Sequence, residues 1–424
     1  MFNMLEIRFV DIHGTLKAMS LPITAEEIST VIADPVFSEG INIDGSSVAG
    51  FTTLECSDLH LSPVADSLFE LPYTEEPKLA VMCEIRQNGN IFAGDTRSQL
   101  RSIIEKHLTT KGLTLKVGPE PEFYIFKDNV PTDQGQYADI FPNAIVEGMV
   151  KRFSQHLTKA LIKPKVHHHE VGPGQYEIEI GYEEALRIAD IIVTYKAIIR
   201  ALAAKSGYTA TFMPKPFIDE AGNGMHYHIS LWEGAKNLFS DSNSNKVSPF
   251  AEHFMAGILE HAQAMTVLVA PTVNSYKRLV PGYEAPVYVA WGPLNRSALI
   301  RVPMFNNSKL ARFEYRGPDP SCNPYLALIS IVTAGMDGVE RELDLLPPIK
   351  RNIYKLSPKE RRELNIKTLP GNLFEALSFL EKDKLLCDAL GDHICKNFFQ
   401  LKKEEWLQYS TQVTDWDWER YFYV

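Results

Sequence analysis

The sequence predicts an α+β protein in which a small N-terminal sheet domain precedes a larger domain of long helices and short strands. Short runs with strand character and frequent turn residues fill roughly the first ninety residues, long helical patterns follow them, and the strands between those helices carry polar residues on one face. A chain of 424 residues is also too long for one ordinary core, which favours more than one domain.

The N-terminal part has the pattern of a small sheet from Ile7 to about Phe92. Its strand candidates are IRFVDI, LKAMSL, LAVMCEI and IFAG, separated by turn signals such as HG and NGN. A helical pattern then covers about 98–112. We therefore expect a domain boundary near residue 100, with domains at 1–100 and 101–424.

Long helical patterns dominate the rest of the chain and alternate with short strands. They cover about 143–161, 184–206, 248–269, 323–342 and 372–406. The intervening strands carry unusual polar residues, which predicts an α+β catalytic domain.

Composition argues against several classes of protein. The chain is 45% hydrophobic and 23% charged, and it has no apolar run near the roughly 18 residues that a membrane span needs. Its first residues lack the basic and apolar stretches of a secretory signal, so we expect a cytoplasmic protein without a membrane partner. A net charge of -10 without a basic stripe argues against nucleic acid. Five cysteines without CxxC spacing fit reduced thiols.

Four candidate strands place acidic, imidazole or guanidinium groups at every second position, and residues two apart on a strand share a face. The sets are Glu120 and Glu122 in GPEPEFYIF, Gln175, Glu177 and Glu179 in GQYEIEI, His226, His228 and Ser230 in GMHYHISLW, and Arg312, Glu314 and Arg316 in ARFEYRG. Any one of these segments also fits an edge strand with its polar face in water. Four together indicate a functional face.

The residue types on this face suggest hard divalent metals. Carboxylates on neighbouring strands repel one another unless cations lie between them, and Mg²⁺ or Mn²⁺ takes oxygen ligands with an occasional imidazole. The HHHE run at 167–170 fits zinc less well, because adjacent strand residues point to opposite faces.

Arginines near these strands suit a phosphorylated species, since guanidinium binds phosphate with two hydrogen bonds. They are Arg278, Arg296, Arg301, Arg312 and Arg316. Metals together with arginines suggest phosphoryl transfer. The sequence has no GxxxxGK[ST] motif, so a Walker-type nucleotide site is unsupported.

Seven motifs in order make the chain resemble a type I glutamine synthetase along nearly its whole length. They are IDGSS, GPEPEF, HHEVGPGQYE, GMHYH, NSYKRLVPGYEAP, NRSALIR and FEYRGPDPSCNPY. The resemblance implies an N-terminal β-grasp domain, a larger glutamine-synthetase-type catalytic α+β domain, and a dodecamer of two hexameric rings with sites shared between subunits. The aromatic residues at 416–423 then fit an inter-ring contact, or packing on their own domain.

The resemblance implies an ATP-dependent, ADP-forming ligase that makes glutamine from glutamate and ammonia through a γ-glutamyl phosphate. It also implies two or more Mg²⁺ or Mn²⁺ ions. Carried over by motif, one metal is bound by Glu122, Glu170 and Glu177, and the second by Glu120, His226 and Glu314.

The other site residues follow from the same motifs. The resemblance implies catalytic roles for Asp44, Glu284, Arg296 and Arg316, with Asp44 supplied by a neighbouring subunit to the ammonium site. It places Tyr137, Gly222 and Arg278 at the substrates together with Arg296 and Arg316. Toward ATP it places His228, Ser230, Arg301 and Arg312.

One departure from the family pattern leaves the amine open. Ala221 stands where the family usually has an asparagine that helps to hold the amino-acid substrate, and such departures occur in relatives that use methylamine, ethanolamine or polyamines. Asp44 and Glu284 favour ammonia, because a bulky amine would relax that acidic site. A catalytically silent scaffold is a third alternative, against which the complete ligand set stands. Tyr354 falls where some members are adenylylated, but the residue alone predicts no regulation.

Overall fold

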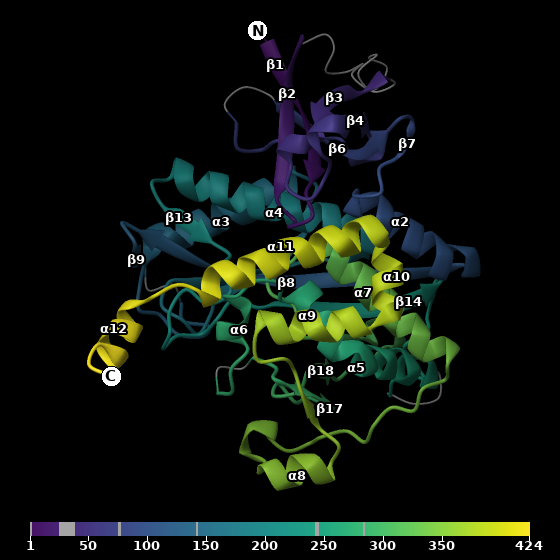
Figure 1. Ribbon diagram of the computed structural model, residues 1–424, viewed down its shortest axis with the longest axis vertical. Coiled ribbons are helices and arrows are strands. Elements are labelled where there is room, and N and C mark those ends of the chain that lie inside the picture. Colours follow the sequence, from purple (N-terminus) through teal and green to yellow (C-terminus); the bar gives the residue numbers. More distant parts are fainter. Residues whose placement is uncertain (1, 25–38, 75–77, 141–142, 242–245, 283–284) are drawn as a thin grey trace.

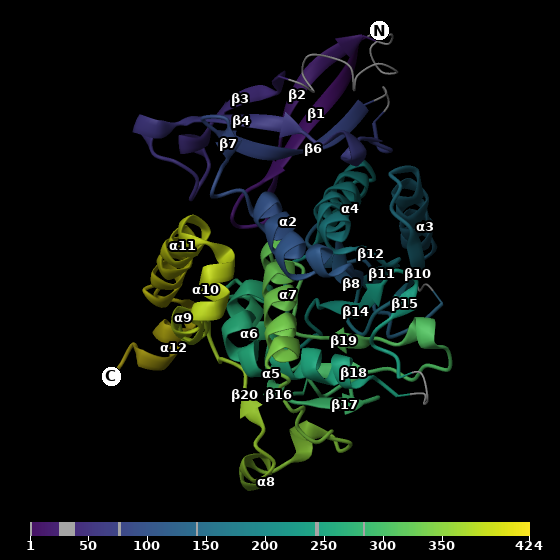
Figure 2. The ribbon, with the colours of Figure 1, turned by 90° about the vertical axis from the view of Figure 1, so that its right-hand side faces the viewer.

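The computed structural model describes residues 2–24, 39–74, 78–140, 143–241, 246–282 and 285–424. Two sheets organise these residues. The N-terminal sheet lies at one end of the long axis and the lobe with helix α8 (Pro358–Glu363) lies at the other end (Figure 1). The larger sheet lies between them, with helices around it (Figure 2).

The N-terminal sheet has the strand order β2-β1-β6-β4-β3, and β5 and β7 pair with β6. The bounds are β1 Phe2–Val10, β2 Leu16–Thr24, β3 Ile41–Asp44, β4 Asp58–Pro63, β5 Phe69–Glu70, β6 Lys78–Gln87 and β7 Asn90–Ile91. β1 and β2 form an antiparallel hairpin, and β1 pairs in parallel with β6. Apolar side chains at alternate positions, such as Leu5 and Ile7, are fully buried against the rest of this sheet.

The larger sheet has the strand order β10-β11-β8-β14-β19-β18-β17, with β9, β12 and β13 on β8 and β15 on β14. The bounds are β8 Leu113–Lys127, β9 Val130–Pro131, β10 Pro164–His169, β11 Gln175–Ile180, β12 Glu183–Glu184, β13 Thr209–Thr211, β14 Met225–Glu233, β15 Lys236–Asn237, β17 Trp291–Pro293, β18 Ile300–Val302 and β19 Phe313–Tyr315. A separate pair joins β16 (Tyr288–Val289) to β20 (Lys367–Thr368).

Long helices pack around the larger sheet, and shorter helices lie between them and at the C-terminal end. The bounds are α2 Thr96–His107, α3 Ala144–Lys159, α4 Ala185–Lys205, α5 Pro249–Val269, α6 Ser275–Arg278, α7 Pro324–Glu340, α9 Leu373–Lys382, α10 Lys384–Leu390, α11 Asp392–Ser410 and α12 Asp415–Tyr421. In Figure 2, α3 and α4 lie between the N-terminal sheet and the larger sheet. α4 contacts both β2 and β8, so it joins the two parts of the chain.

Local sequence explains where several helices begin. Asp95, Asn143, Ser248 and Asn323 are N-caps whose side chains accept hydrogen bonds from backbone amides of the first helical turn. Proline follows Ser248 and Asn323 at the first helical position, where its missing N–H leaves no bond unmade.

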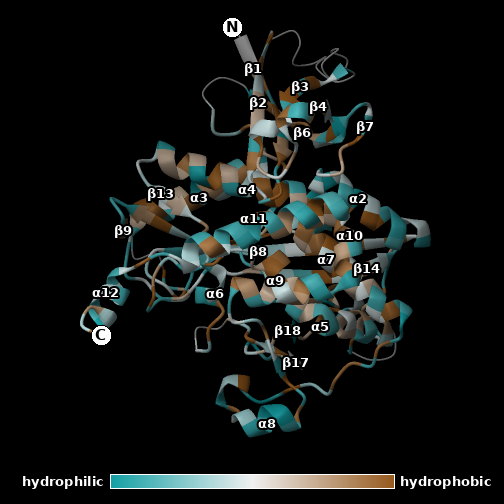
Figure 3. Cartoon of the chain, in the orientation of Figure 1, coloured by the Kyte–Doolittle hydropathy of each residue, from teal (hydrophilic) through white to brown (hydrophobic). Residues whose placement is uncertain are grey.

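Helices α5 and α7 cross closely because glycines face one another. A Cβ at Gly257 would lie 2.0 Å from the carbonyl oxygen of Ala334, and a Cβ at Gly338 would lie 2.2 Å from the carbonyl oxygen of His253. Larger residues at either position would therefore force the helices apart. These helices form the apolar centre of the molecule, whereas α8 and much of α11 carry hydrophilic residues (Figure 3).

The expectation of one helix over 372–406 is wrong. Three helices occupy this range, because Asp383 caps the start of α10 and Gly391 adopts a positive φ of 77° between α10 and α11. The other predicted helices are present at nearly the predicted bounds. The predicted α+β class is confirmed, and the structure adds β3 and β4, which the sequence patterns did not reveal. Among the described residues, no helix has the length and apolar character that crossing a membrane requires.

Candidate functional site

Strand register builds the candidate site. The four strands with alternating polar residues are neighbours in the larger sheet, in the order β11, β8, β14 and β19. Across these ladders Glu177 lies opposite Glu122, His226 opposite Glu120, and Glu314 opposite His228. Facing residues in antiparallel strands have Cβ atoms about 4.5–5.5 Å apart, so each pair presents its side chains together.

Two prolines occupy β8 without weakening this arrangement. Pro119 and Pro121 alternate with the glutamates and pair with Tyr227 and Met225 of β14. On the opposite edge, β11 pairs with 122–124 and β12 with 116–117. The prolines lie between these two stretches, where the ladder needs no amide hydrogen from them.

The first carboxylate cluster consists of Glu122, Glu170 and Glu177, each of which offers an oxygen within 4.8 Å of the others. Burial raises the pKa of Glu122, and burial together with the charges of Glu120, Glu122 and Glu170 raises the pKa of Glu177 well above its ordinary value. Two buried carboxylates and the partly buried Glu170 so close together are costly when ionised, and a divalent cation would remove that cost. The donor set therefore fits Mg²⁺ or Mn²⁺.

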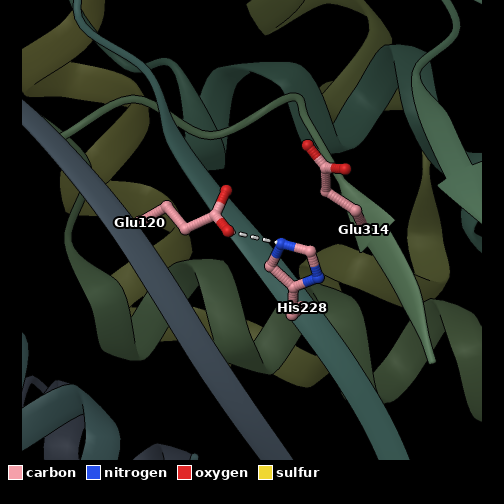
Figure 4. Close-up of side chains that lie close together, drawn as sticks. All are labelled: Glu120, His228 and Glu314. Atoms are coloured by element: carbon pink, nitrogen blue, oxygen red, sulfur yellow. Dashed lines mark ion pairs between the residues drawn. The ribbon is translucent and has the colours of Figure 1, made fainter. Parts of the chain in front are cut away.

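The second cluster adjoins the first and combines two carboxylates with two imidazoles. Figure 4 shows Glu120, His228 and Glu314 close together on three strands, with Glu120 directed at His228. His228 Nε2 lies 2.7 Å from Glu120 Oε1. His226 Nδ1 lies 3.7 Å from Glu120 Oε2 and 3.6 Å from Glu314 Oε1, which is longer than a hydrogen bond. These three atoms surround a common space, so an ion there can be held by the same carboxylates.

Protonation in the second cluster differs from that in the first. Burial would raise the pKa of Glu120, but hydrogen bonds and charges from His226 and His228 outweigh it and lower the pKa. Burial would also raise the pKa of Glu314, whereas the positive charges around it, Arg316 first, lower it to about 2. Burial and Arg316 lower the pKa of His226 to about 4, so its imidazole is neutral at neutral pH and available as a ligand.

Arginines surround the second cluster. Arg316 donates to Glu314 Oε1 at 2.6 Å, Arg301 donates to the other oxygen of Glu314, and Arg312 donates to His228 Nδ1 at 3.1 Å. Ser230 is buried further along the same face of β14 and accepts a hydrogen bond from Trp232. This side of the site is suited to bind phosphate groups.

A cavity of about 330 Å³ opens beside both clusters. Glu122, Glu170, His226, Arg278, Arg316 and Gly222 are among its lining residues. Arg278 is buried and donates to the backbone oxygens of Gly317 and Arg316, both at 3.2 Å. Ala221 also lines the cavity, and its carbonyl accepts a hydrogen bond from Tyr124 at 2.7 Å. A small carboxylate-bearing substrate fits such a cavity.

Several predicted site residues lie apart from the clusters. Asp44 caps a short 3-10 helix (Gly45–Ser47) in the N-terminal sheet and is not among the residues that line the cavity. Arg296 is exposed and lines a second opening of about 760 Å³, which shares Gly282 with the first. Tyr137 is half exposed, with its ring 5.3 Å from the ring of His168. Glu284 lies outside the described residues.

The structure also shows polar residues around the clusters for which the sequence patterns predicted no role. Gln175 donates to Glu122, to the Gly222 carbonyl and to Asn223 at 3.0–3.3 Å. His168 lies 3.3 Å from Glu177 and 3.6 Å from Glu170, whereas His169 points the other way and contacts Asp133 at 2.8 Å. The alternating pattern of GQYEIEI gave a signal for Gln175 and the HHHE run gave one for the two histidines, but no pattern gave a signal for Asp133.

Comparisons with known proteins cover the whole chain. One family model, described as "Glutamine synthetase, beta-Grasp domain", matches residues 1–88, and another, "Glutamine synthetase, catalytic domain", matches residues 93–421. Curated glutamine synthetases of Pyrococcus abyssi and Thermotoga maritima are each 43% identical to this chain, over 99% of it and 96% of their own length. A solved complex of GmaS with ADP is similar with a TM-score of 0.88 and 29% identity, over 99% of this chain and 96% of that one. A Plasmodium falciparum glutamine synthetase shares the fold with a TM-score of 0.86. It is 24% identical over 99% of this chain and 95% of its own length.

Proposed function

The chain belongs to the glutamine synthetase family, and we propose that it is an ATP-dependent ligase that joins ammonia to the side-chain carboxylate of glutamate. The observation that carries this proposal is the pair of adjoining clusters beside one arginine-lined cavity. ATP would phosphorylate the glutamate side chain, and the ammonia nitrogen would then displace phosphate from the resulting acyl phosphate.

The two clusters would together hold two divalent cations, one in each cluster. Glu122, Glu170 and Glu177 would hold one divalent ion, and Glu120, His226 and Glu314 the other, with His228 beside them. When bound, Mg²⁺ or Mn²⁺ neutralises negative charge on phosphoryl and carboxylate oxygens. The buried charge balance supports this division, since the first cluster has an excess of carboxylates and the second contains imidazoles and contacts arginines.

The arginines are placed to bind and orient the reacting anions. Arg278, fixed by two backbone carbonyls at the cavity wall, would bind the substrate carboxylate. Arg316 lies where the cavity meets the second cluster and would stabilise charge on the transferring phosphoryl group. Arg301, Arg312, His228 and Ser230 would contact ATP, and the exposed Arg296 would reach the reacting centre from the second opening.

Ammonium binding requires acidic groups that remain ionised. Hydrogen bonds from Ser46 and Ser47 lower the pKa of Asp44, so its carboxylate is charged at neutral pH. Because Asp44 lies outside the cavity of its own chain, we expect a neighbouring subunit to supply it. With Glu284 and Tyr137 it would attract ammonium and accept its proton.

A shared site requires an oligomer, which we propose is a dodecamer of two hexameric rings. The C-terminal helix α12 projects from the body of the chain, and its Trp416 and Trp418 are 59% and 57% exposed (Figure 1). Such exposed aromatic residues fit a contact between rings.

Sharing can be tested by mixing two defective variants. Asp44→Asn and Glu122→Gln proteins should each be inactive. Subunits mixed after dissociation should regain about a quarter of wild-type activity, because a random head-to-tail ring pairs intact halves at that frequency. An active monomer, or no recovery in mixed oligomers, contradicts the shared site.

The proposed reaction is tested by glutamine formation and phosphate release with ATP, Mg²⁺ and glutamate. Ammonium, methylamine, ethanolamine and a polyamine are supplied in parallel. We expect ammonium to be preferred, because the full-length curated relatives are glutamine synthetases. Glu122→Gln should abolish activity, whereas Glu105→Gln, on an exposed face of α2, should not. Preference for another amine would make the protein a γ-glutamyl amide ligase. No product and no phosphate release with any of the four amines would contradict ligase activity.

A further inference from the structure

Asp133 gathers an unusual number of hydrogen bonds for a loop residue. It follows the short strand β9, yet its side chain is only 3% exposed. Its carboxylate accepts from His169 Nε2 at 2.8 Å, the amides of Gly135 and Gly174 at 3.0 Å each, the Tyr176 hydroxyl at 2.5 Å and the Thr132 hydroxyl at 3.3 Å. These donors come from separate parts of the chain, so Asp133 connects the loop after β9 to β10, to β11 and to the turn between them.

Two of these donors are sequence neighbours of residues in the first carboxylate cluster. His169 precedes Glu170, and Tyr176 precedes Glu177. Because successive strand residues point to opposite faces, Asp133 lies behind the strands whose front face carries the carboxylates. The other nitrogen of His169 lies 2.6 Å from the Glu170 carbonyl oxygen, which fixes the backbone at Glu170 itself.

The turn between β10 and β11 is held at both ends. The amide of Glu170 donates to the carbonyl of Gln175 at 2.8 Å, and Asp133 binds the amide of Gly174 within the turn. Gly174 has a φ of 68°, a left-handed conformation that glycine adopts readily, so the turn itself is unstrained. The hydrogen bonds that the Asp133 carboxylate accepts therefore add to this backbone bond in setting how the Glu170 end lies relative to β11.

Asp133 also reaches the segment that carries Tyr137. Its bond to the Gly135 amide fixes the chain two residues before Tyr137, whose ring packs edge-on against His168. His168 in turn lies next to Glu170 and Glu177. One buried carboxylate thus orders the rear of the cluster and the tyrosine at its side.

We propose that Asp133 is a positioning residue that holds Glu170 and Glu177 in the arrangement a divalent cation requires, an inference that rests on the proposed function for the identity of this cluster. Asp133 is not a member of either cluster and does not line the cavity. It acts through His169, Tyr176 and the Gly174 turn. Groups that orient metal ligands in this way commonly change metal affinity 10- to 100-fold when they are replaced.

Asp133→Asn tests the proposal, because it keeps the shape of the side chain and replaces one acceptor oxygen by an amide that cannot accept a hydrogen bond. Mn²⁺ binding to the intact oligomer, without ATP or glutamate, is followed by calorimetry and by electron paramagnetic resonance. We expect one of the two Mn²⁺ sites to weaken about 10- to 100-fold and the other to change less than about twofold. Asp139→Asn is the matched control, since Asp139 is exposed and, within the part of the chain that the structure describes, its side chain accepts from the nearby Gln136 amide only. It should leave both sites unchanged.

Unchanged Mn²⁺ affinity at both sites in folded Asp133→Asn would overturn the proposal and leave Asp133 as a loop anchor only. Equal weakening of both sites would also overturn it. If Asp133→Asn does not fold, Tyr176→Phe removes one donor and should weaken the same site by a smaller factor, and no change would refute the proposal. Wild-type protein that binds Mn²⁺ at two sites but makes no glutamine would refute the proposed function and leave this inference intact.

Discussion

Arg97 donates two hydrogen bonds to the carboxylate of Asp190, at 3.0 and 2.9 Å, and both side chains are buried. The pair joins α2, which follows the N-terminal sheet, to the long helix α4. Tyr325 of α7 donates to the same carboxylate at 2.7 Å. Three helices from distant parts of the sequence therefore meet at one buried charge pair.

Arg97→Met should destabilise the protein by about 3–5 kcal/mol, because it leaves Asp190 buried without its countercharge. Chemical denaturation of wild type and variant measures the difference. Arg351→Met is the matched control, since the Arg351 side chain is 63% exposed in its ion pair with Glu360 and should contribute less than about 1 kcal/mol. Similar losses in both variants would contradict the importance of the buried pair.

Stability should depend on pH through His261. Burial lowers the pKa of this imidazole, but hydrogen bonds and charges from Asp383 and Asp337 outweigh it and raise the pKa above its ordinary 6.5. Arg341 also bonds to Asp337. A raised histidine pKa means that the folded state holds the proton more tightly, so the stabilisation is complete below pH 6.5 and is lost as the pH rises through the folded pKa.

His261→Gln should therefore cost about 1.5–3 kcal/mol near pH 6 and progressively less at higher pH. Thermal or chemical unfolding across this range measures the effect. His156→Gln, at a half-buried position of α3 whose imidazole bonds to the Arg152 carbonyl and, among the described residues, not to a carboxylate, should show little change at any pH. A loss of stability in His261→Gln that stays constant with pH would count against an imidazolium between the two carboxylates.

Ala221→Asn should strengthen glutamate binding. The side chain at this position lines the cavity, and a restored amide hydrogen bond worth about 0.5–1.5 kcal/mol would lower the KM for glutamate about 2- to 12-fold with little change in kcat. Ile218→Asn, at an 83% exposed position outside the lining residues, should leave KM unchanged. An unchanged or higher KM in Ala221→Asn would show that this side chain does not face glutamate.

Replacing the exposed tryptophans of α12 should separate the rings. In Trp416→Ser/Trp418→Ser we expect light scattering to report about half the wild-type mass, because the proposed inter-ring contact loses its aromatic anchors. Activity per subunit should persist, since each shared site would lie within a ring. Val130→Ser, at another exposed apolar position, should keep the full mass. A variant that keeps the wild-type mass would place α12 outside the interface.

The alternating pattern of four strands was enough to predict one functional face. A period of two places Glu120 with Glu122 on a face whatever surrounds the strand, because that geometry is local. Their partners were not predictable in the same way. The register that sets Glu177 opposite Glu122 depends on pairing between residues 55 positions apart, which no local pattern encodes.

Residues that lie behind the carboxylate clusters could not be predicted from sequence patterns either. Asp133 lies in a loop whose sequence resembles an ordinary turn, and only the folded chain brings five donors around it.

The prediction of a single helix over 372–406 was wrong for a related reason. Its apolar spacing continues across Asp383 and Gly391, whereas capping and a left-handed glycine break the backbone there.

The backbone of strand β8 sets the distance between the two clusters. Glu120 and Glu122 belong to different clusters and are two residues apart on one extended strand, a repeat of roughly 6.6 Å along the chain. Side-chain rotations adjust this spacing only slightly, because hydrogen bonding to β14 fixes the strand. A single-residue insertion between the glutamates would turn Glu122 to the opposite face, and it would turn the buried Phe123 and Ile125 over with it. The number of residues between Glu120 and Glu122 therefore sets the separation of the two clusters, and a change in that number would disrupt the clusters more than a substitution elsewhere on β8.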